Sequence, residues 1–381
     1  MAATAAGRPG ACSAHEAGTE EKRTSPNGIS AMNTQLTASI IVNNYNYGRF
    51  LAEAIDSALA QTYPNVEVIV VDDGSTDNSR EIIAGYGNRI IPVLKENGGQ
   101  GSALNAGFAA STGDLILFLD ADDVLYPNAI EVLAREWRDD LSRIYFLLQL
   151  VDEEGQPCGG LTGGTTMPSP MLGPFTSGSS TTGNVLSRAA LERVMPIPEE
   201  EWRIAPDFYV SATTSLFGEA KRLARPLGDY RVHGKNNGVC VELPYQAKKH
   251  IHYHLRLYDA MFRLTDGKVG SLENWLGRCP QHWICRIRLL RERPHEYSWP
   301  DTLPGLTVRA VKAAWRQPER RFHQRLAYSI YALAYGLFPR KLTRLLGKLV
   351  PMARIVAPRE QQEESDNLAR AAEQSRATVR A

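Results

Sequence analysis

Short, almost uninterrupted apolar runs recur along the chain, and each is followed by a segment with helical periodicity. The runs lie at residues 39–42, 66–71, 90–94 and 115–119. An apolar run without regular polar alternation is typical of a strand that is buried on both faces, as in a parallel sheet covered by helices. The alternation of such strands with helices predicts an α/β fold with a doubly wound, mostly parallel sheet.

Further strands are predicted at residues 144–151 and 223–230. Between them, residues 155–183 are rich in Gly, Pro, Ser and Thr and contain few long apolar runs. Loops of this length are uncommon inside a compact domain and are usually functional. We therefore expect this segment to be a lid over a binding site.

Polar clusters follow the predicted strands. Residues 43–48 favour a turn, Asp72 and Asp73 end the second strand, and Asp120, Asp122 and Asp123 follow the fourth. In open α/β sheets, ligands bind just beyond the carboxyl ends of the strands. Carboxylates at this edge suit Mg²⁺ or Mn²⁺, which prefer oxygen ligands. The alternative is a solvated loop with helix-capping aspartates.

A glycine-rich turn follows the third predicted strand. Gly98 and Gly99 would let the backbone approach a bulky anion, and a helix that begins there would point its N–H groups toward it. The turn does not match a dinucleotide-binding fingerprint, because Leu104 stands in place of the third glycine and the motif does not follow the first strand. Hydride transfer with a dinucleotide cofactor is therefore excluded.

Composition narrows the classes of function. Hydrophobic residues make up 43% and charged residues 22% of the 381 residues, as is ordinary for a globular protein. The net charge of +1 provides no overall field for nucleic acid, so no nucleic-acid partner is expected. Five scattered cysteines without a CxxC pair argue against a zinc site or a disulfide framework. With no stretch of ~20 apolar residues, we expect a cytoplasmic protein.

Four regions are expected along the chain. Residues 1–36 contain almost no large apolar side chains, so we expect a disordered leader. Residues 37–240 are expected to form the α/β domain and residues 241–357 a helical C-terminal region. Residues 358–381 are expected to be a polar, flexible tail.

The C-terminal region combines helix formers with basic residues. His250, His252 and His254 suggest a metal site, but only the first and third share a helical face and no acidic partner lies in register. A solvated basic helix is therefore favoured. Residues 326–338 are apolar but too short to span a bilayer, and a basic amphipathic stretch follows. Two roles stay open for this region: peripheral membrane contact through residues 326–356, and packing on the α/β domain.

Four motifs together resemble those of the family 2 inverting glycosyltransferases with the GT-A fold. They are a first strand ending near Tyr45-Asn46, Val-Val-Asp-Asp-Gly-Ser-Thr-Asp at residues 70–77, Asn97-Gly98-Gly99 followed by Ala-Leu-Asn-Ala-Gly at residues 103–107, and Asp120-Ala121-Asp122-Asp123. The resemblance covers residues 39–233, and the combination is more specific than any single motif. It implies a GT-A (Rossmann-like), mostly parallel sheet flanked by helices, with a helical C-terminal extension.

The resemblance also implies an activity. The chain would be a metal-dependent transferase that moves a sugar from a nucleoside-diphosphate sugar, expected to be a UDP-sugar, to an acceptor hydroxyl with inversion. The acceptor would be a glycan, a polysaccharide or a lipid-linked saccharide, as in polysaccharide biosynthesis for the cell envelope. The location would be cytoplasmic or peripheral on the cytoplasmic face of the membrane.

Positions of the motifs imply the roles of individual residues. Tyr45 would stack on the donor base and Asp73 would hydrogen-bond to it. The full nucleotide-binding set would be Asn43, Tyr45, Asp73, Gly98, Gly99 and Asp120. The metal, Mg²⁺ or Mn²⁺, would be held by Asp122, Asp123 and His233, and would stabilise the charge on the departing diphosphate.

A general base for the acceptor hydroxyl is also required. The resemblance places it at Asp207, with Glu201 as the reserve candidate, while a helix N-cap after Pro206 is the alternative role of Asp207. Arg231 is expected to contact the diphosphate. The chain departs from many relatives at Leu104, where they carry an arginine, so one phosphate contact is in doubt.

Two other functions stay open. A catalytically silent nucleotide-sugar binding or scaffold protein would be consistent with Leu104 and with an unassigned base. A sugar-nucleotide nucleotidyltransferase would need a Gly-rich basic loop after the first strand, which residues 43–48 do not provide.

Overall fold

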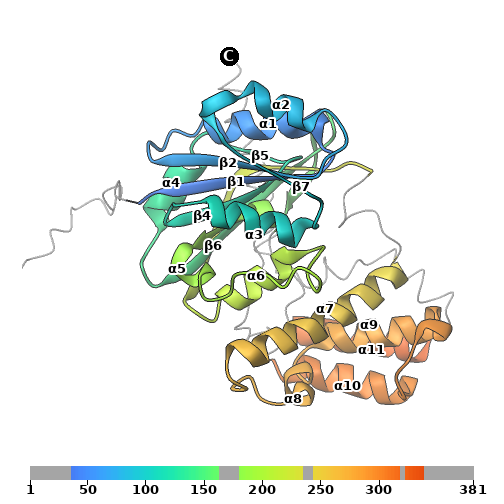
Figure 1. The fold of residues 1–381 in the computed structure, drawn as a ribbon. Coiled ribbons are helices and arrows are strands. Elements are labelled where there is room, and N and C mark those ends of the chain that lie inside the picture. The colour runs from blue at the N-terminus through green and yellow to red at the C-terminus, as the bar shows by residue number, and fades with distance from the viewer. Residues whose placement is uncertain (1–35, 163–179, 235–242, 318–321, 339–381) are drawn as a thin grey trace, which may run out of the picture.

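The computed structural model describes residues 36–162, 180–234, 243–317 and 322–338. The expected leader before residue 36, the middle of the expected lid and the tail beyond residue 338 lie outside the described residues. One nine-stranded sheet runs through the described α/β part, in the order β3-β2-β1-β4-β8-β6-β9-β5, with β7 paired to β6 (Figure 1). The predicted α/β fold with helices on both faces of the sheet is confirmed.

The first half of the sheet is parallel. It contains β1 (Ala38–Asn44), β2 (Val66–Asp73), β3 (Ile91–Lys95) and β4 (Leu115–Asp120). These strands are connected by α1 (Gly48–Leu59), α2 (Ser79–Gly85) with a short 3-10 turn at Gly87–Arg89, and α3 (Gln100–Ala110). Because all four strands run the same way, their carboxyl ends lie along one edge.

β1 and β4 are apolar along most of their length because the two faces of the sheet belong to two different cores, whereas the edge strand β3 has no buried residue, so the expectation that it is buried on both faces is wrong. Ile40 and Val42 pack with α1, α2 and α4 (Ala129–Glu136) on one face. Ile41 packs with α3 on the other face, in a core that continues into the C-terminal helices. Figure 1 shows α1 and α2 above the sheet and α3 below it. A strand buried on both sides has no position left for polar alternation.

The second half of the sheet is mixed. It contains β5 (Val124–Leu125), β6 (Leu141–Val151), β7 (Pro157–Thr162), β8 (Asn184–Ser187) and β9 (Glu219–Arg231). β8 is antiparallel to β4 and β6, while β9 is parallel to β6. The expectation of an irregular loop over residues 155–183 is wrong at its two ends, where β7 and the 3-10 turn η3 (Thr181–Gly183) form. Pairing with β6 compensates for the weak strand propensity of the glycines in β7.

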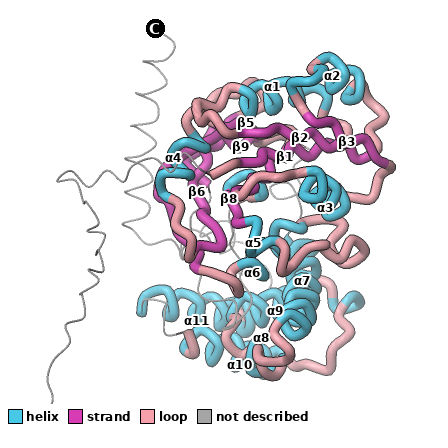
Figure 2. The backbone as a smooth tube through the Cα atoms, turned by 60° about the vertical axis from the view of Figure 1, so that its left-hand side comes forward, coloured by secondary structure: helices cyan, strands magenta, loops and turns pink. Residues whose placement is uncertain are grey.

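Helices fill the remainder of the described chain. α5 (Arg188–Leu191) and α6 (Pro206–Thr214) pack below the sheet, and α7 (Leu243–Leu264) packs on α6. Beyond it lie α8 (Leu272–Leu276), α9 (Pro280–Glu292), the 3-10 turn η4 (Pro294–Glu296), α10 (Leu303–Trp315) and α11 (Phe322–Leu337). Figure 2 shows these helices gathered in a bundle under α3 and α6. The predicted helical C-terminal region is confirmed, and no described helix is long and apolar enough to cross a membrane.

Two histidines lie buried between α7 and α9. His254 and His282 are both fully buried, with their Nδ1 atoms 3.2 Å apart. The expectation that the face of α7 carrying His250 and His254 is solvated is therefore wrong for His254. Its spacing from Ile251 and Leu257, both fully buried, places it on the packed face, and this pattern is visible in the sequence. No group of three potential ligands that could hold a metal is found among the described side chains.

The buried histidines make the stability of the helical region sensitive to acid. Burial lowers the pKa of His282 to about 3 and lowers the pKa of His254 well below its ordinary value. The unfolded chain then binds more protons than the folded chain below pH 6.5, so stability falls as pH drops from 6.5 toward 3. Each histidine costs up to about 1.4 kcal/mol per pH unit in that window. Urea unfolding at pH 7.5 and pH 5.5 measures the loss, which should be smaller in His254→Gln/His282→Gln. An equal loss in that double variant would contradict the account.

Candidate functional site

Side chains from two neighbouring parallel strands and from helix α3 meet at the carboxyl edge of the sheet. Asn43 of β1 pairs in register with Asp120 of β4, and its amide donates a 2.7 Å hydrogen bond to the Asp120 carboxylate. Gln100, the first residue of α3, donates to the same carboxylate oxygen at 3.3 Å. The buried Asn43 Oδ1 has no hydrogen-bond partner among the described residues. Asn43 and Asp120, two residues of the expected nucleotide-binding set, are therefore in direct contact.

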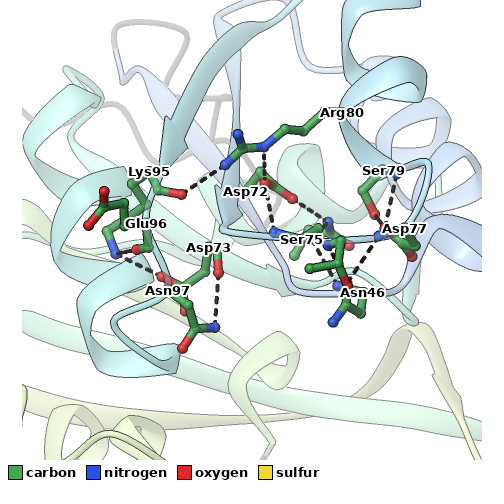
Figure 3. Close-up of polar contacts among 12 residues, drawn as sticks. Asn46, Asp72, Asp73, Ser75, Asp77, Ser79, Arg80, Lys95, Glu96 and Asn97 are labelled. Atoms are coloured by element: carbon green, nitrogen blue, oxygen red, sulfur yellow. Dashed lines mark hydrogen bonds and ion pairs between the residues drawn. The ribbon is translucent and has the colours of Figure 1, made fainter.

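The loops after β1 and β2 are bound to each other (Figure 3). The Asn44 amide donates to Asp72 at 3.0 Å, and Asp72 also accepts from Arg80 at 2.7 Å. Asn46, at a φ of 59°, accepts from the backbone N–H of Thr76 at 2.7 Å. Tyr45 stands between these fixed points and is 46% exposed. This loop presents an aromatic ring to solvent from a rigid base, as stacking on a ligand ring requires.

Asp73 organises the glycine turn that follows β3. Its carboxylate accepts from the backbone N–H groups of Gly98 at 2.9 Å and Gly99 at 2.7 Å, and from Lys95 Nζ at 2.7 Å. The Asn97 amide donates to the Asp73 carbonyl at 2.9 Å, and Figure 3 shows both residues at this turn. Asp73 is nearly fully buried. The geometry gives Asp73 a turn-building role, and its expected contact with a base stays a prediction.

Gly99 has a backbone conformation that only glycine adopts readily. Its φ is 91° and its ψ is 172°. A Cβ at this position would lie 2.4 Å from Cγ of Arg203, whose guanidinium donates to the Gly98 carbonyl at 3.0 Å and to Asn97 Oδ1 at 2.6 Å. Arg203 and Asp73 thus hold the turn from two sides. Sequence reasoning did not identify Arg203, because its contact with the turn joins segments about a hundred residues apart.

Gly99→Ala should weaken nucleotide binding by about 5- to 150-fold. The backbone strain alone is worth roughly 1–3 kcal/mol, and the methyl group would also displace Arg203. Titration of the full chain with UDP measures the effect. Gly85→Ala is the matched control, because a Cβ at Gly85 meets nothing within 4 Å. Wild-type affinity in Gly99→Ala would contradict the assignment of this turn to the binding site.

The three aspartates after β4 have different surroundings. Asp122 Oδ2 lies 2.8 Å from His233 Nε2. Asp123 is buried, and its two oxygens accept from the Thr182 hydroxyl at 2.6 Å and from the Arg231 backbone N–H at 3.0 Å. Burial and the charge of Asp122 raise the pKa of Asp120 to about 7, and the same causes raise the pKa of Asp123 well above its usual value. Burial and mutual repulsion disfavour the ionised form of these carboxylates, so a cation between them would stabilise their charges.

Arg231 and His233 hold the segment that carries Asp122. The Arg231 guanidinium donates to the Asp122 carbonyl at 3.0 Å and to the Glu153 carbonyl at 2.8 Å, and it lies over the Phe50 ring at 4.8 Å. The His233 ring stacks on Phe50, with centroids 5.5 Å apart. The guanidinium is thus buried against protein carbonyls and the Glu53 carboxylate, and its expected contact with a diphosphate stays a prediction. The expected role of His233 as a metal ligand stays a prediction.

Asp207 lies in the first turn of α6, directly after Pro206. Ala205 is the N-cap residue of this helix, so the alternative that Asp207 is the N-cap is wrong. Burial raises the pKa of Asp207, while backbone N–H groups of the first turn and the charge of Lys249 on α7 oppose that rise. The charge of Asp207 in turn raises the pKa of Asp120, so the two carboxylates are close enough to interact electrostatically.

Leu104 does not face the site. It is fully buried in the core below the sheet, together with Ile41 and Ile69. The side-chain amide of the next residue, Asn105, donates to the Ile197 carbonyl at 3.0 Å, and its Oδ1 accepts from the Ile197 backbone N–H at 2.8 Å. A leucine at position 104 thus contributes to packing, which removes one argument for a catalytically silent protein.

Comparisons with known proteins identify part of the chain. Residues 39–159 match the model of "Glycosyl transferase family 2". An uncharacterized glycosyltransferase of Nostoc sp. is 37% identical over 211 residues, covering 52% of this chain and 66% of that protein. The chondroitin synthase of Pasteurella multocida is 39% identical over 122 residues, covering 31% of this chain and 13% of that protein. The chain therefore spans less than two thirds of the length of these curated relatives.

Solved structures give a weaker similarity. A mannosyltransferase from Pyrobaculum calidifontis, in complex with GDP-Man and Mn²⁺, is 15% identical with a TM-score of 0.47. The alignment covers 84% of this chain and 89% of that chain.

Proposed function

Residues 39–159 belong to glycosyl transferase family 2, and from this premise we propose that the chain transfers a sugar from a nucleoside-diphosphate sugar to an acceptor hydroxyl with inversion at the anomeric carbon. The observation that carries the proposal is the convergence of Asp120, the Asp73-bound glycine turn and Asp207 at the carboxyl edge of the parallel strands. This edge is where open α/β sheets bind ligands. Residues 37–240 would form the catalytic domain.

The donor would lie across the loops after β1, β2 and β3. The exposed Tyr45 ring would stack on the base, which we propose to be uracil. The glycine turn would place backbone close to the diphosphate, and the N-terminus of α3 would face its negative charge. Asn43 and Asp120 would complete the nucleotide site.

The residues at this edge fit a divalent cation. Asp120 and Asp122 supply carboxylates, and the unpartnered Asn43 Oδ1 adds a neutral oxygen, which is the donor set that Mg²⁺ and Mn²⁺ prefer. The absence of a three-ligand cluster among the described residues is compatible with such an ion, which commonly takes only one or two protein carboxylates together with substrate phosphates. We assign Asp122 as the principal ligand, with Asp123 and His233 adjacent. When bound, the cation would neutralise charge on the leaving diphosphate.

Asp207 would accept the proton of the acceptor hydroxyl. Its raised pKa makes it a stronger base than an exposed aspartate, and a carboxylate in such an environment meets the requirement for general-base catalysis. Arg231 would act indirectly, because it holds the Asp122 carbonyl and thereby orients the acidic segment.

The acceptor would be a glycan, a polysaccharide or a lipid-linked saccharide. We include in the proposal a peripheral position at the cytoplasmic face of a membrane, where lipid-linked acceptors would be reached. The helical region, residues 241–357, would make that contact.

A donor screen tests the proposed function. The full chain is incubated with UDP- and GDP-sugars in the presence of Mn²⁺ and of candidate acceptors, and release of the nucleoside diphosphate is measured. We expect release with at least one UDP-sugar and a loss of release when the metal is chelated. Absence of release from every donor, with the protein folded and able to bind UDP, would leave only nucleotide-sugar binding as the function.

A further inference from the structure

One face of α11 exposes large apolar side chains along its whole length. Phe322, Leu326, Ile330, Leu333 and Leu337 are between 42% and 67% exposed. At 3.6 residues per turn, their spacing of three and four residues places them on one side of the helix. Trp315 of α10 joins the row through an edge contact with Phe322, with ring centroids 5.6 Å apart. These six residues are called the apolar stripe below.

The opposite face of α11 is anchored in the protein. Tyr328, Tyr331, Ala332 and Tyr335 are buried against the core that α9 and α10 also line. The stripe is therefore held outward by a packed helix. Monomeric proteins seldom expose a continuous apolar surface of this kind without a partner for it.

The sequence around the stripe is predominantly basic, with Glu319 between the two helices as an acidic exception. Residues 302–317 and 322–338 contain no Asp or Glu, and they contain Arg309, Lys312, Arg316 and Arg325. Arg309 is paired with Asp301 at 3.1 Å. The sequence that follows α11, residues 339–359, adds six basic residues and again no acidic one. A partner of the stripe must therefore tolerate a positively charged border.

We propose that the apolar stripe is a docking surface for a lipid bilayer that contains anionic headgroups. Acyl chains would accept the apolar side chains, and the headgroups would balance the surrounding cations. A second copy of the chain fits less well, because a two-fold interface through the stripe would bring two positive borders together. The helix would lie along the surface, since α11 is about 24 Å long and carries a buried face. This inference deepens the peripheral position in the proposed function, but it requires no transferase activity.

Vesicle sedimentation of the full chain tests the proposal, without donor or acceptor. Vesicles of phosphatidylglycerol and phosphatidylcholine in equal parts are compared with vesicles of phosphatidylcholine alone, at low and high salt. Ile330→Glu changes the stripe at a residue that is 58% exposed, so the fold should not be disturbed. Ile91→Glu on β3, at a residue that is 41% exposed, is the matched control.

The proposal predicts binding to the anionic vesicles that weakens at high salt. Ile330→Glu should bind at least about tenfold more weakly, while Ile91→Glu should bind like the wild type. Unfolding midpoints and UDP titrations of the same proteins report whether each variant is folded and whether the donor site is intact, which separates failure here from failure of the proposed function. Equal binding by Ile330→Glu, no binding by the wild type, or self-association of the wild type that Ile330→Glu abolishes would each overturn the proposal.

Discussion

Asp207→Asn is expected to lower the rate of sugar transfer by about 10²- to 10⁴-fold, the range that general-base catalysis supplies. The asparagine keeps the size and the position in the first turn of α6 but cannot accept the proton of the acceptor hydroxyl. Binding of UDP should stay within about twofold of the wild type, because Asp207 is assigned no contact with the nucleotide. Initial rates of nucleoside-diphosphate release with acceptor measure the first quantity, and titration measures the second.

Glu201→Gln is the matched control for this variant. Glu201 is the other candidate for the base, and its carboxylate lies 3.4 Å from the Arg263 guanidinium, away from the acidic cluster. We expect its transfer rate to stay close to that of the wild type. A large loss in Glu201→Gln with an active Asp207→Asn would assign the base to Glu201 instead.

Asp122→Asn is expected to lower donor turnover by more than about 10²-fold, which exceeds the loss typical for residues that only support a metal ligand. The change removes the charge that we assign to the cation, and it replaces the carboxylate that contacts His233. Release of the nucleoside diphosphate across a range of Mn²⁺ concentrations measures the effect. A weakened ligand site should need more Mn²⁺ for the same rate.

Asp114→Asn controls for a general effect of charge at β4. Asp114 immediately precedes that strand, at its other end, and accepts hydrogen bonds from the backbone and the hydroxyl of Thr37. Asp114→Asn should weaken these hydrogen bonds, lower the stability of the protein slightly and leave donor turnover unchanged. If Asp114→Asn lost as much turnover as Asp122→Asn, the loss would reflect disturbed folding of the strand.

The fold could be predicted from the sequence because its strongest signals are local. The inner strands of the parallel half are compact apolar runs, since alternate residues such as Ile40 and Ile41 enter two separate cores. In the mixed half, the strands predicted at residues 144–151 and 223–230 form as β6 and β9. The pairing of β8 with β4 and β6 could not be predicted, because it depends on contacts across long stretches of chain. β7 likewise depends on β6 for its hydrogen bonds.

The candidate site was predictable in its residue types and less so in its contacts. Asn43 and Asp120 were both expected in the nucleotide-binding set, and strand register makes them neighbours. The contact of Asp73 with the glycine turn could not be foreseen, because backbone N–H groups carry no sequence signal. Arg231 was expected at a phosphate, yet its guanidinium binds carbonyls that only the folded chain brings near. Long-range polar contacts of this kind are set by the tertiary fold.

In the helical region, too, local features could be predicted from the sequence, while long-range contacts could not. The burial of His254 could have been found from its spacing to Ile251 and Leu257, since all three fall on one helical face. The contact of His254 with His282 could not be predicted, because His282 lies on α9, and the packing of α9 against α7 is set by the tertiary fold. α11 packs on α9 and α10, and membrane contact through residues 326–356 stays a proposal. One face packs in the core, and the other carries the exposed stripe.

The central claim is that the carboxyl edge of β1, β2 and β4 binds a nucleoside diphosphate together with a divalent cation at Asp122. Calorimetric titration of the full chain with UDP, with and without Mn²⁺, tests it most directly when wild type and Asp122→Asn are compared. We predict that Mn²⁺ tightens UDP binding to the wild type by about tenfold or more and leaves Asp122→Asn unaffected. The claim would be contradicted if UDP did not bind, or if Mn²⁺ tightened binding equally in both proteins.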